Sequence, residues 1–99
     1  MRAYVGLYVA RLEMPWVKSL KEKRALVRPA IERLRARYPV SAARLEGQNA
    51  HTWEVVGLTL IGHDPAWIEE VLQKAAAFLA AQGEYRVAEE GLEVLLWEL

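Results

Sequence analysis

The stretch Ser19-Leu20-Lys21-Glu22-Lys23-Arg24 decides where the chain turns from strand to helix. It has the pattern of a capping box, in which the Ser19 hydroxyl accepts from the Glu22 amide and the Glu22 carboxylate accepts from the Ser19 amide. Behind it, apolar residues recur at the helical spacings of three, four and seven, at Leu20, Val27, Ile31, Leu34 and Tyr38. The segment is therefore expected to form a helix from Leu20 to about Tyr38, with one face packed on a core.

Pro29 lies well inside this expected helix and removes one backbone hydrogen bond, at a typical cost of about 3 kcal/mol. Ile31 and Leu34 continue the apolar stripe on the far side of the proline. We therefore expect one helix with a kink near Ala25–Arg28, and not two separate helices.

The rest of the chain divides into one further helix and four strands. The alternation of apolar residues and the turn residues predict strands over Arg2–Met14, Val40–Glu46, Trp53–Ile61 and Tyr85–Leu99, the last bent or bulged around Glu89–Gly91. Asp64 as N-cap and Pro65 at the first helical position open the second helix, and Gly83 ends it.

This β-α-β-β-α-β order is typical of the ferredoxin-like α+β fold. Right-handed crossovers then place both helices on one face of a four-stranded antiparallel sheet. The first and third strands are expected in its centre, because they are the most continuously apolar. Residues 1–99 are expected to form a single domain, since no linker or internal repeat interrupts them.

The composition describes a compact protein with an uneven distribution of charge. The apolar share is 54%, and cysteine is absent, which excludes disulfides and thiolate chemistry. The first apolar run is too short for a membrane span and lacks a signal-peptide layout, so a cytoplasmic location without membrane contact is expected. Residues 1–45 hold eleven basic and three acidic side chains, whereas residues 46–99 hold two basic and ten acidic ones. Either one surface meets an anionic partner, or the two halves neutralise each other.

The expected first helix carries the strongest signal for a binding surface. Eight basic side chains stand against two acidic ones between residues 18 and 37. On a helical wheel, one flank of the apolar stripe collects Lys21, Arg24, Arg28 and Arg35. These side chains could contact the phosphates of RNA or of a ribosomal partner, with Gln48 and Asn49 of the following turn as polar contacts. The alternative is an ordinary solvated helix face with weak ion pairs.

The helix-free face of the sheet gives a second hypothesis, a homodimer. If the alternation of the strands holds, this face carries Tyr4, Tyr8, Leu12, Trp53, Val55, Leu95 and Trp97. The third strand lacks the basic-glycine-aromatic run by which one RNA-binding module stacks bases, so a protein interface is the better reading. A third reading is a small-molecule regulatory domain, for which the sequence locates no polar pocket.

The sequence gives little support for a catalytic site, a cofactor site or a metal site. We therefore expect a protein that is not an enzyme. His51 and His63 are the only histidines, and no second ligand lies at metal-like spacing. Asp64 and Ser19 are explained by their capping roles, and no glycine-rich phosphate loop is present. The segment Met14–Lys18 does not resemble the arginine-bearing loop of acylphosphatases, which share the fold. No catalytic residue, cofactor or metal ligand is therefore assigned.

The Ser19–Arg24 stretch resembles the start of the first helix in the YlxP-like family, bacterial proteins catalogued as a domain of unknown function. The resemblance extends over nearly the whole chain and includes Arg33-Leu34-Arg35, Val40-Ser41 and the Glu69–Leu72 helix. It implies a ferredoxin-like fold, no defined catalytic residue and, through genes that often neighbour those for translation initiation and ribosome maturation, an association with RNA or ribosomes. The family turn Gln-Asp-x-Trp-Gln-Arg is replaced here by Gln48–Trp53, so the role of this turn is not carried over.

Overall fold

The elements follow one another in the order that the sequence predicts. The computed structural model describes residues 1–99 as β1 (Arg2–Glu13), α1 (Leu20–Arg37), β2 (Ser41–Glu46), β3 (Trp53–Gly62), α2 (Pro65–Ala81) and β4 (Arg86–Glu98). The strands form one antiparallel sheet in the order β2-β3-β1-β4. The ferredoxin-like α+β fold is thus confirmed, with β1 and β3 in the centre of the sheet as expected.

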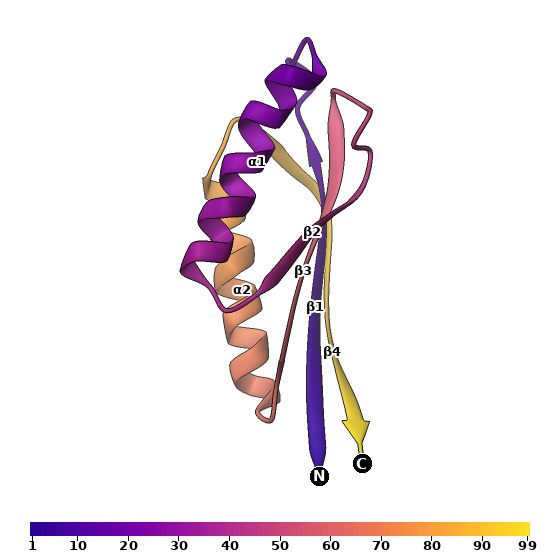
Figure 1. The fold of residues 1–99 in the computed structure, drawn as a ribbon, viewed down its shortest axis with the longest axis vertical. Helices are drawn as coiled ribbons and strands as arrows, with labels where there is room; N and C mark the ends of the chain where they lie inside the picture. The colour runs from indigo at the N-terminus through magenta and orange to yellow at the C-terminus, as the bar shows by residue number, and fades with distance from the viewer.

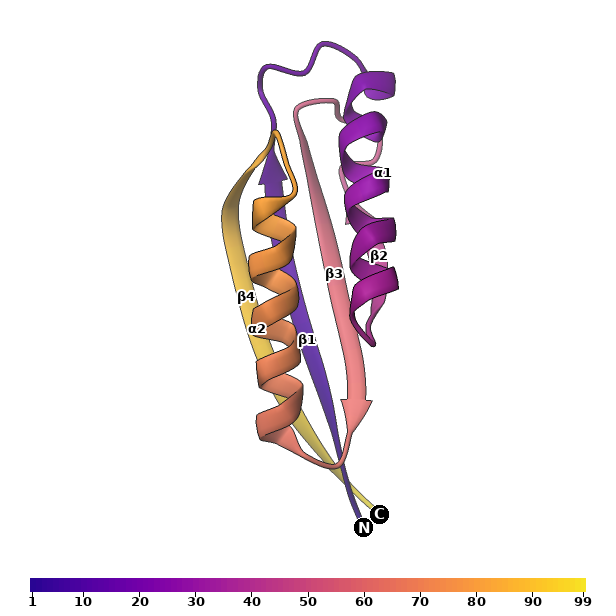
Figure 2. The same cartoon turned by 90° about the vertical axis from the view of Figure 1, so that its left-hand side faces the viewer.

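Both helices cover the same face of the sheet, and no helix covers the other face (Figure 1). α1 lies over the β2–β3 half, whereas α2 lies over the β1–β4 half (Figure 2). The domain is elongated, with extents of 49 × 21 × 18 Å. β1 and β4 reach beyond the start of α2 as a ribbon, where the Met1 amino group donates to the Leu99 carbonyl at 2.9 Å. Neither helix combines the length and the apolar character that crossing a membrane requires.

The helix starts are set by local side-chain bonds. The Ser19 Oγ accepts from the Glu22 amide at 3.1 Å, as the capping-box pattern predicts. The return bond differs, because the Glu22 carboxylate accepts from the Lys18 amide at 3.1 Å and not from that of Ser19. α2 begins with Asp64 as N-cap, whose carboxylate accepts from the Ala66 amide at 3.0 Å. These caps satisfy amides that have no partner within the helix.

The proline in α1 and the irregularity in β4 can be compared with the sequence. α1 runs as one helix across Pro29, as expected, whereas the kink near Ala25–Arg28 stays a prediction. In β4, the register against β1 shifts between Val87 and Glu89, which leaves Ala88 as the extra residue of a bulge. The bulge thus precedes the predicted Glu89–Gly91 position, and β4 curves toward the helix layer at this end of the sheet (Figure 1).

The predicted assignment of the two faces of β1 is wrong. Tyr8 and Leu12, expected on the helix-free face, are buried in the core beneath the helices, and Tyr4 packs against that core. Both faces of β1 are apolar, so the alternation alone does not choose between them. Gly6 determines which face of β1 the helices cover. It lies on the same face as Tyr8, and a Cβ at this position would lie 2.4 Å from the Ile68 Cγ2 of α2. The helix therefore approaches the face that carries the glycine.

The helix-free face carries the aliphatic residues of β1 instead. Val5 and Leu7 lie on it, and its most exposed apolar side chains are Leu7, Leu45, Ile61, Leu95 and Trp97. The register of the sheet also places Trp53, Val55, Leu95 and Trp97 on this face, where the sequence expects them. Their part in a dimer stays a prediction.

Candidate functional site

Lys23, in the first turn of α1, is completely buried and holds the loop between β2 and β3. Its ammonium group donates to the carbonyls of Gly47 at 2.7 Å, of Trp53 at 3.3 Å and of Ala50. A further carbonyl, that of Gln48, lies at 3.4 Å. An ammonium group has three N–H donors and no acceptor, so a ring of carbonyls matches its chemistry. Lys23 thus fixes the path of the loop against the start of α1.

The charge of Lys23 is balanced by Glu54 at the start of β3. The Lys23 Nζ lies 2.9 Å from one carboxylate oxygen of Glu54, and both side chains are inaccessible to solvent. The Arg44 guanidinium on β2 binds the same carboxylate through two nitrogens, one of them at 2.8 Å. Burial works to raise the pKa of Glu54, but the hydrogen bonds from Arg44 and Lys23 outweigh it, so that the pKa lies below its ordinary value.

The loop that Lys23 holds has a defined conformation. Gly47 adopts a φ of 81°, which favours glycine, and a Cβ there would lie 2.6 Å from the ring of Trp53. On its other side the Trp53 ring meets the Arg11 guanidinium, 4.4 Å from the ring centroid. The Gln48 side chain donates to the Arg44 carbonyl at 3.0 Å. Its amide nitrogen is therefore engaged within the loop, whereas Asn49 is exposed.

The basic residues predicted to bind phosphate lie along the β2 side of α1. Lys21, Arg24 and Arg28 are exposed and take part in no ion pair of the structure. Arg35 differs from these three residues, because its guanidinium has partners within the domain. It donates to Glu32 at 2.8 Å and to the Ala42 carbonyl of β2 at 2.6 Å. Since the Lys23 ammonium holds the turn, the structure brings Gln48 and Asn49 to the same end of the domain as Lys21 and Arg24. We call Lys21, Arg24 and Arg28 the basic stripe.

The other flank of α1 faces α2 and is not free. Arg33 donates to the Gln82 side chain at 3.0 Å, and the Arg37 guanidinium lies 4.9 Å from the centroid of the Phe78 ring. Arg33 and Arg37 therefore have partners on α2, although both remain exposed and keep their charge.

Most acidic side chains of residues 46–99 belong to α2 and β4, which lie in the β1–β4 half of the domain, away from α1 (Figure 2). The two basic residues of this acidic half of the sequence are both paired, Lys74 with Glu70 at 2.8 Å and Arg86 with Glu13. Cross-neutralisation of the two halves is thus partial. Glu54 binds Lys23 and Arg44 internally, while the basic stripe has no acidic partner.

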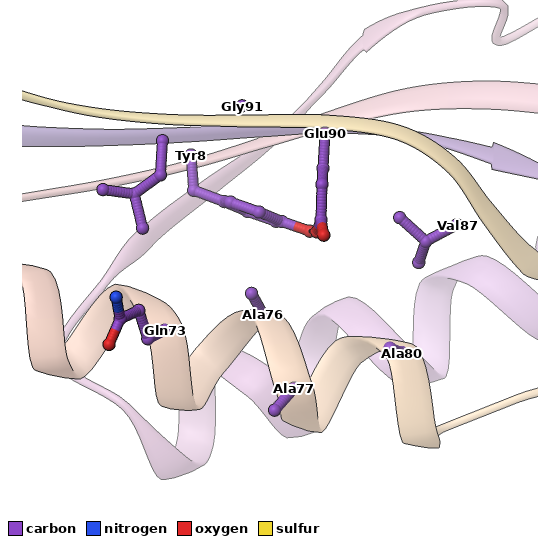
Figure 3. A pocket seen from close by; sticks show the side chains of 9 residues that line it. Tyr8, Gln73, Ala76, Ala77, Ala80, Val87, Glu90 and Gly91 are labelled. Atoms are coloured by element: carbon purple, nitrogen blue, oxygen red, sulfur yellow. The ribbon is translucent and has the colours of Figure 1, made fainter.

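A groove separates α2 from β4 on this acidic side (Figure 3). Tyr8, on the β1 floor, donates its hydroxyl to the Glu90 carboxylate of β4. Burial raises the pKa of the Tyr8 hydroxyl, and the hydrogen bond to Glu90 adds to this effect. Small alanine side chains form the α2 wall of the groove.

The sequence analysis assigns no role to Lys23, Glu54 or Glu90. For Lys23 and Glu54, the periodicity of the sequence does indicate a buried side chain. Lys23 lies in phase with Val27, Ile31 and Leu34 on the apolar stripe of α1, which predicts an inward side chain. Glu54 likewise shares its phase with the buried residues of β3. A lysine and a glutamate that both point into one core predict a buried pair. Glu90 carries no such signal, because β4 is largely exposed on both faces.

No group of three or more histidine, cysteine, aspartate or glutamate side chains is arranged to hold a metal ion. In comparisons with known proteins, a family model described as a protein of unknown function (DUF503) matches residues 5–91. No curated protein matches the chain. The matched segment runs from β1 through both helices to the middle of β4 and includes Lys23, Glu54 and the basic stripe. The chain therefore belongs to the DUF503 family.

Proposed function

We propose that this protein is a non-enzymatic module that binds RNA, alone or within a ribosomal particle, through the basic stripe of α1. The observation that carries the proposal is the exposure of Lys21, Arg24 and Arg28 on one side of a helix with no acidic partner. Successive phosphates of a nucleic acid backbone are the anionic partner that such a row of cations fits best. The resemblance of Ser19–Arg24 to the YlxP-like family supports the same direction.

The loop beside the stripe gives the surface a fixed shape. Because the Lys23 ammonium binds the loop carbonyls, Asn49 and His51 are presented next to the start of α1 by a rigid turn. Trp16, in the segment that leads into α1, is 52% exposed and offers a surface on which a base can stack. Phosphate contacts from the stripe would thus be combined with polar and aromatic contacts at one end of it.

The test is retention of total RNA and of purified ribosomal subunits at low and moderate salt. The double variant Arg24→Glu/Arg28→Glu should lose at least about tenfold in affinity, because two phosphate contacts become repulsive. The slope of log affinity against log salt should fall by about 1.5, as expected for two lost contacts.

A matched control separates a local contact from the effect of net charge. Arg2→Glu/Lys74→Glu changes the net charge by the same amount at exposed positions away from the stripe. This control should retain most of the affinity. Equal losses in the two double variants, or no retention of RNA by the unchanged protein at low salt, would contradict the proposal.

A second candidate function is a homodimer through the helix-free face of the sheet. The observation that favours it is a row of exposed apolar side chains on that face, including Leu7 at 39%, Leu95 at 49% and Trp97 at 57%. Charged side chains such as Arg11 and Glu93 lie toward its margins. An apolar centre with a polar margin is typical of homodimer interfaces. The two candidates use different surfaces and are compatible.

A further inference from the structure

The groove between α2 and β4 has the dimensions of a small-molecule site. Its volume is about 490 Å³, within the range of known ligand pockets. Ala76, Ala77 and Ala80 form the α2 wall, and their short side chains leave the space open (Figure 3). Val87 and Leu92 of β4 form the facing wall. A ligand in this groove would therefore lie mainly against hydrocarbon.

One carboxylate projects into this apolar groove. Glu90 lies opposite Ala10 in the sheet register, which places its side chain on the helix side of β4. Its carboxylate receives the Tyr8 hydroxyl, and Figure 3 shows the two side chains meeting end to end above Ala76. Glu90 takes part in no ion pair, whereas Glu70 and Glu13 are each bound to a basic side chain.

The hydrogen bond from Tyr8 uses only part of the capacity of the Glu90 carboxylate to accept hydrogen bonds. An ionised carboxylate has two oxygens with about four acceptor positions, and a single hydroxyl occupies one of them. Glu90 is exposed, so its remaining acceptor positions are open to water or to a ligand. The Tyr8 bond occupies Oε2 of Glu90, whereas Oε1 accepts no hydrogen bond from the protein.

No basic side chain of the acidic half competes for Glu90, because Lys74 is paired with Glu70 and Arg86 with Glu13. Glu89 and Glu93 are close to Glu90 on β4 but lie on the helix-free face, so Glu90 is the one carboxylate that lines the groove. The groove thus combines an apolar body with one fixed anionic end.

We propose that the α2–β4 groove binds a small primary amine, with its ammonium group on Glu90 and its hydrocarbon chain between Ala77 and Leu92. Gln73, at the end of the α2 wall, offers an amide to a second polar group of the ligand. The groove lies at the β4 edge of the domain and the basic stripe at the β2 edge, so one site can be occupied without blocking the other (Figure 2). It supplies the pocket that a small-molecule regulatory domain requires.

Titration with n-pentylamine, followed by two-dimensional NMR of the backbone amides, tests this site. We expect saturable shift changes at millimolar concentration, confined to residues 73–80 and 87–92. The neutral analogue n-pentanol, which has the same number of heavy atoms, should bind at least about tenfold more weakly, because it lacks the charge–carboxylate contact.

Three variants locate the contacts. Glu90→Gln keeps the shape of the side chain and should weaken amine binding by at least about tenfold. Ala77→Leu changes an exposed position and should block the groove by filling it. Glu93→Gln removes an equal charge from the opposite face of the same strand and should bind amine almost as the unchanged protein does.

Three results would overturn the proposal. They are the absence of saturable shifts, equal binding of n-pentanol, and equal weakening by Glu93→Gln and Glu90→Gln. The spectrum of each variant without ligand shows whether its fold is kept, so that loss of binding is not confused with unfolding.

Discussion

At the scale of single residues, Lys23 has the most demanding environment in the molecule. Removing an ammonium group from water costs several kcal/mol, and only complete pairing offsets this cost. Here the loop carbonyls and the Glu54 carboxylate together surround the charge. A different loop conformation would take the Gly47 and Ala50 carbonyls away from the Lys23 ammonium and leave it buried with the Glu54 carboxylate as its main partner. The pair therefore specifies the loop conformation more than it adds net stability.

Replacing Lys23 by methionine should lower the free energy of unfolding by about 3–5 kcal/mol. Methionine fits the space but leaves the loop carbonyls and part of Glu54 without a donor. Urea denaturation measures the change. The matched control is Lys21→Met, at an exposed position of the same helical turn, which should stay within about 0.5 kcal/mol of the unchanged protein. A Lys23→Met protein as stable as the control would show that the buried contacts contribute little.

Glu54 should also make the protein sensitive to acid. Its pKa in the folded state lies below the ordinary value of 4.5, despite burial, because Arg44 and Lys23 stabilise the carboxylate. The stability from this shift is fully present above pH 4.5 and is lost as the pH falls through the lower, folded-state pKa. Glu13, bound by Arg86 and Arg11, has a lowered pKa and contributes in the same direction.

The free energy of unfolding, measured by urea denaturation across the acidic range, tests this expectation. Glu54→Gln should be less stable at neutral pH and should lose less of its stability on acidification than the unchanged protein. The control Glu98→Gln removes a carboxylate that is exposed at the end of β4, and it should keep the full acid dependence. An equally steep acid limb in Glu54→Gln would assign the sensitivity to other groups.

At the scale of the elements, the sequence carries enough information to order the helices and strands but not to orient every strand. The caps at Ser19 and Asp64 and the turn at Gly47 are local signals, and each lies where the sequence places it. The orientation of β1 is not local, since Val5 and Leu7 are as apolar as the residues between them. It depends on the close approach of α2 to Gly6, which only the packed fold shows.

The candidate sites also differ in how far the sequence alone predicts them. The basic stripe follows from helical periodicity, so Lys21, Arg24 and Arg28 could be grouped before the structure was known. The pair of Arg35 with Glu32 is local to α1, whereas its bond to the Ala42 carbonyl depends on the distance between α1 and β2. The α2–β4 groove requires the relative positions of three elements and a bulge in β4, and periodicity describes none of these.

At the scale of the whole molecule, three surfaces of different chemistry surround one core. The β2 side of α1 is basic, the α2–β4 side is acidic and hollowed, and the helix-free face of the sheet is apolar. The helix side of the domain carries the first two surfaces, and the sheet separates them from the third (Figure 1). A second copy on the helix-free face would leave both the basic stripe and the groove open to their ligands.

The area of the helix-free face is sufficient for a dimer. Extents of 49 Å along the strands and 18 Å across them bound the footprint at roughly 900 Å², which is large enough to contain the roughly 800 Å² that each partner contributes to a standard interface. A hollow of about 150 Å³ above Gly57, bordered by Leu7 and Leu45, gives this face relief into which a side chain of the partner can fit. A second copy presents the same apolar surface and, by two-fold symmetry, can bury all of it at once.

Sedimentation velocity at micromolar concentration should therefore show a dimer, and neighbouring residues of β4 provide a sharp test of the face involved. Leu95 and Leu96 are both 49% exposed but lie on opposite faces of the strand. Leu95→Glu should yield a monomer, because it places a charge in the apolar interface. Leu96→Glu introduces the same charge on the other face and should leave the dimer intact. A monomeric unchanged protein, or equal dissociation in both variants, would exclude the helix-free face as the interface.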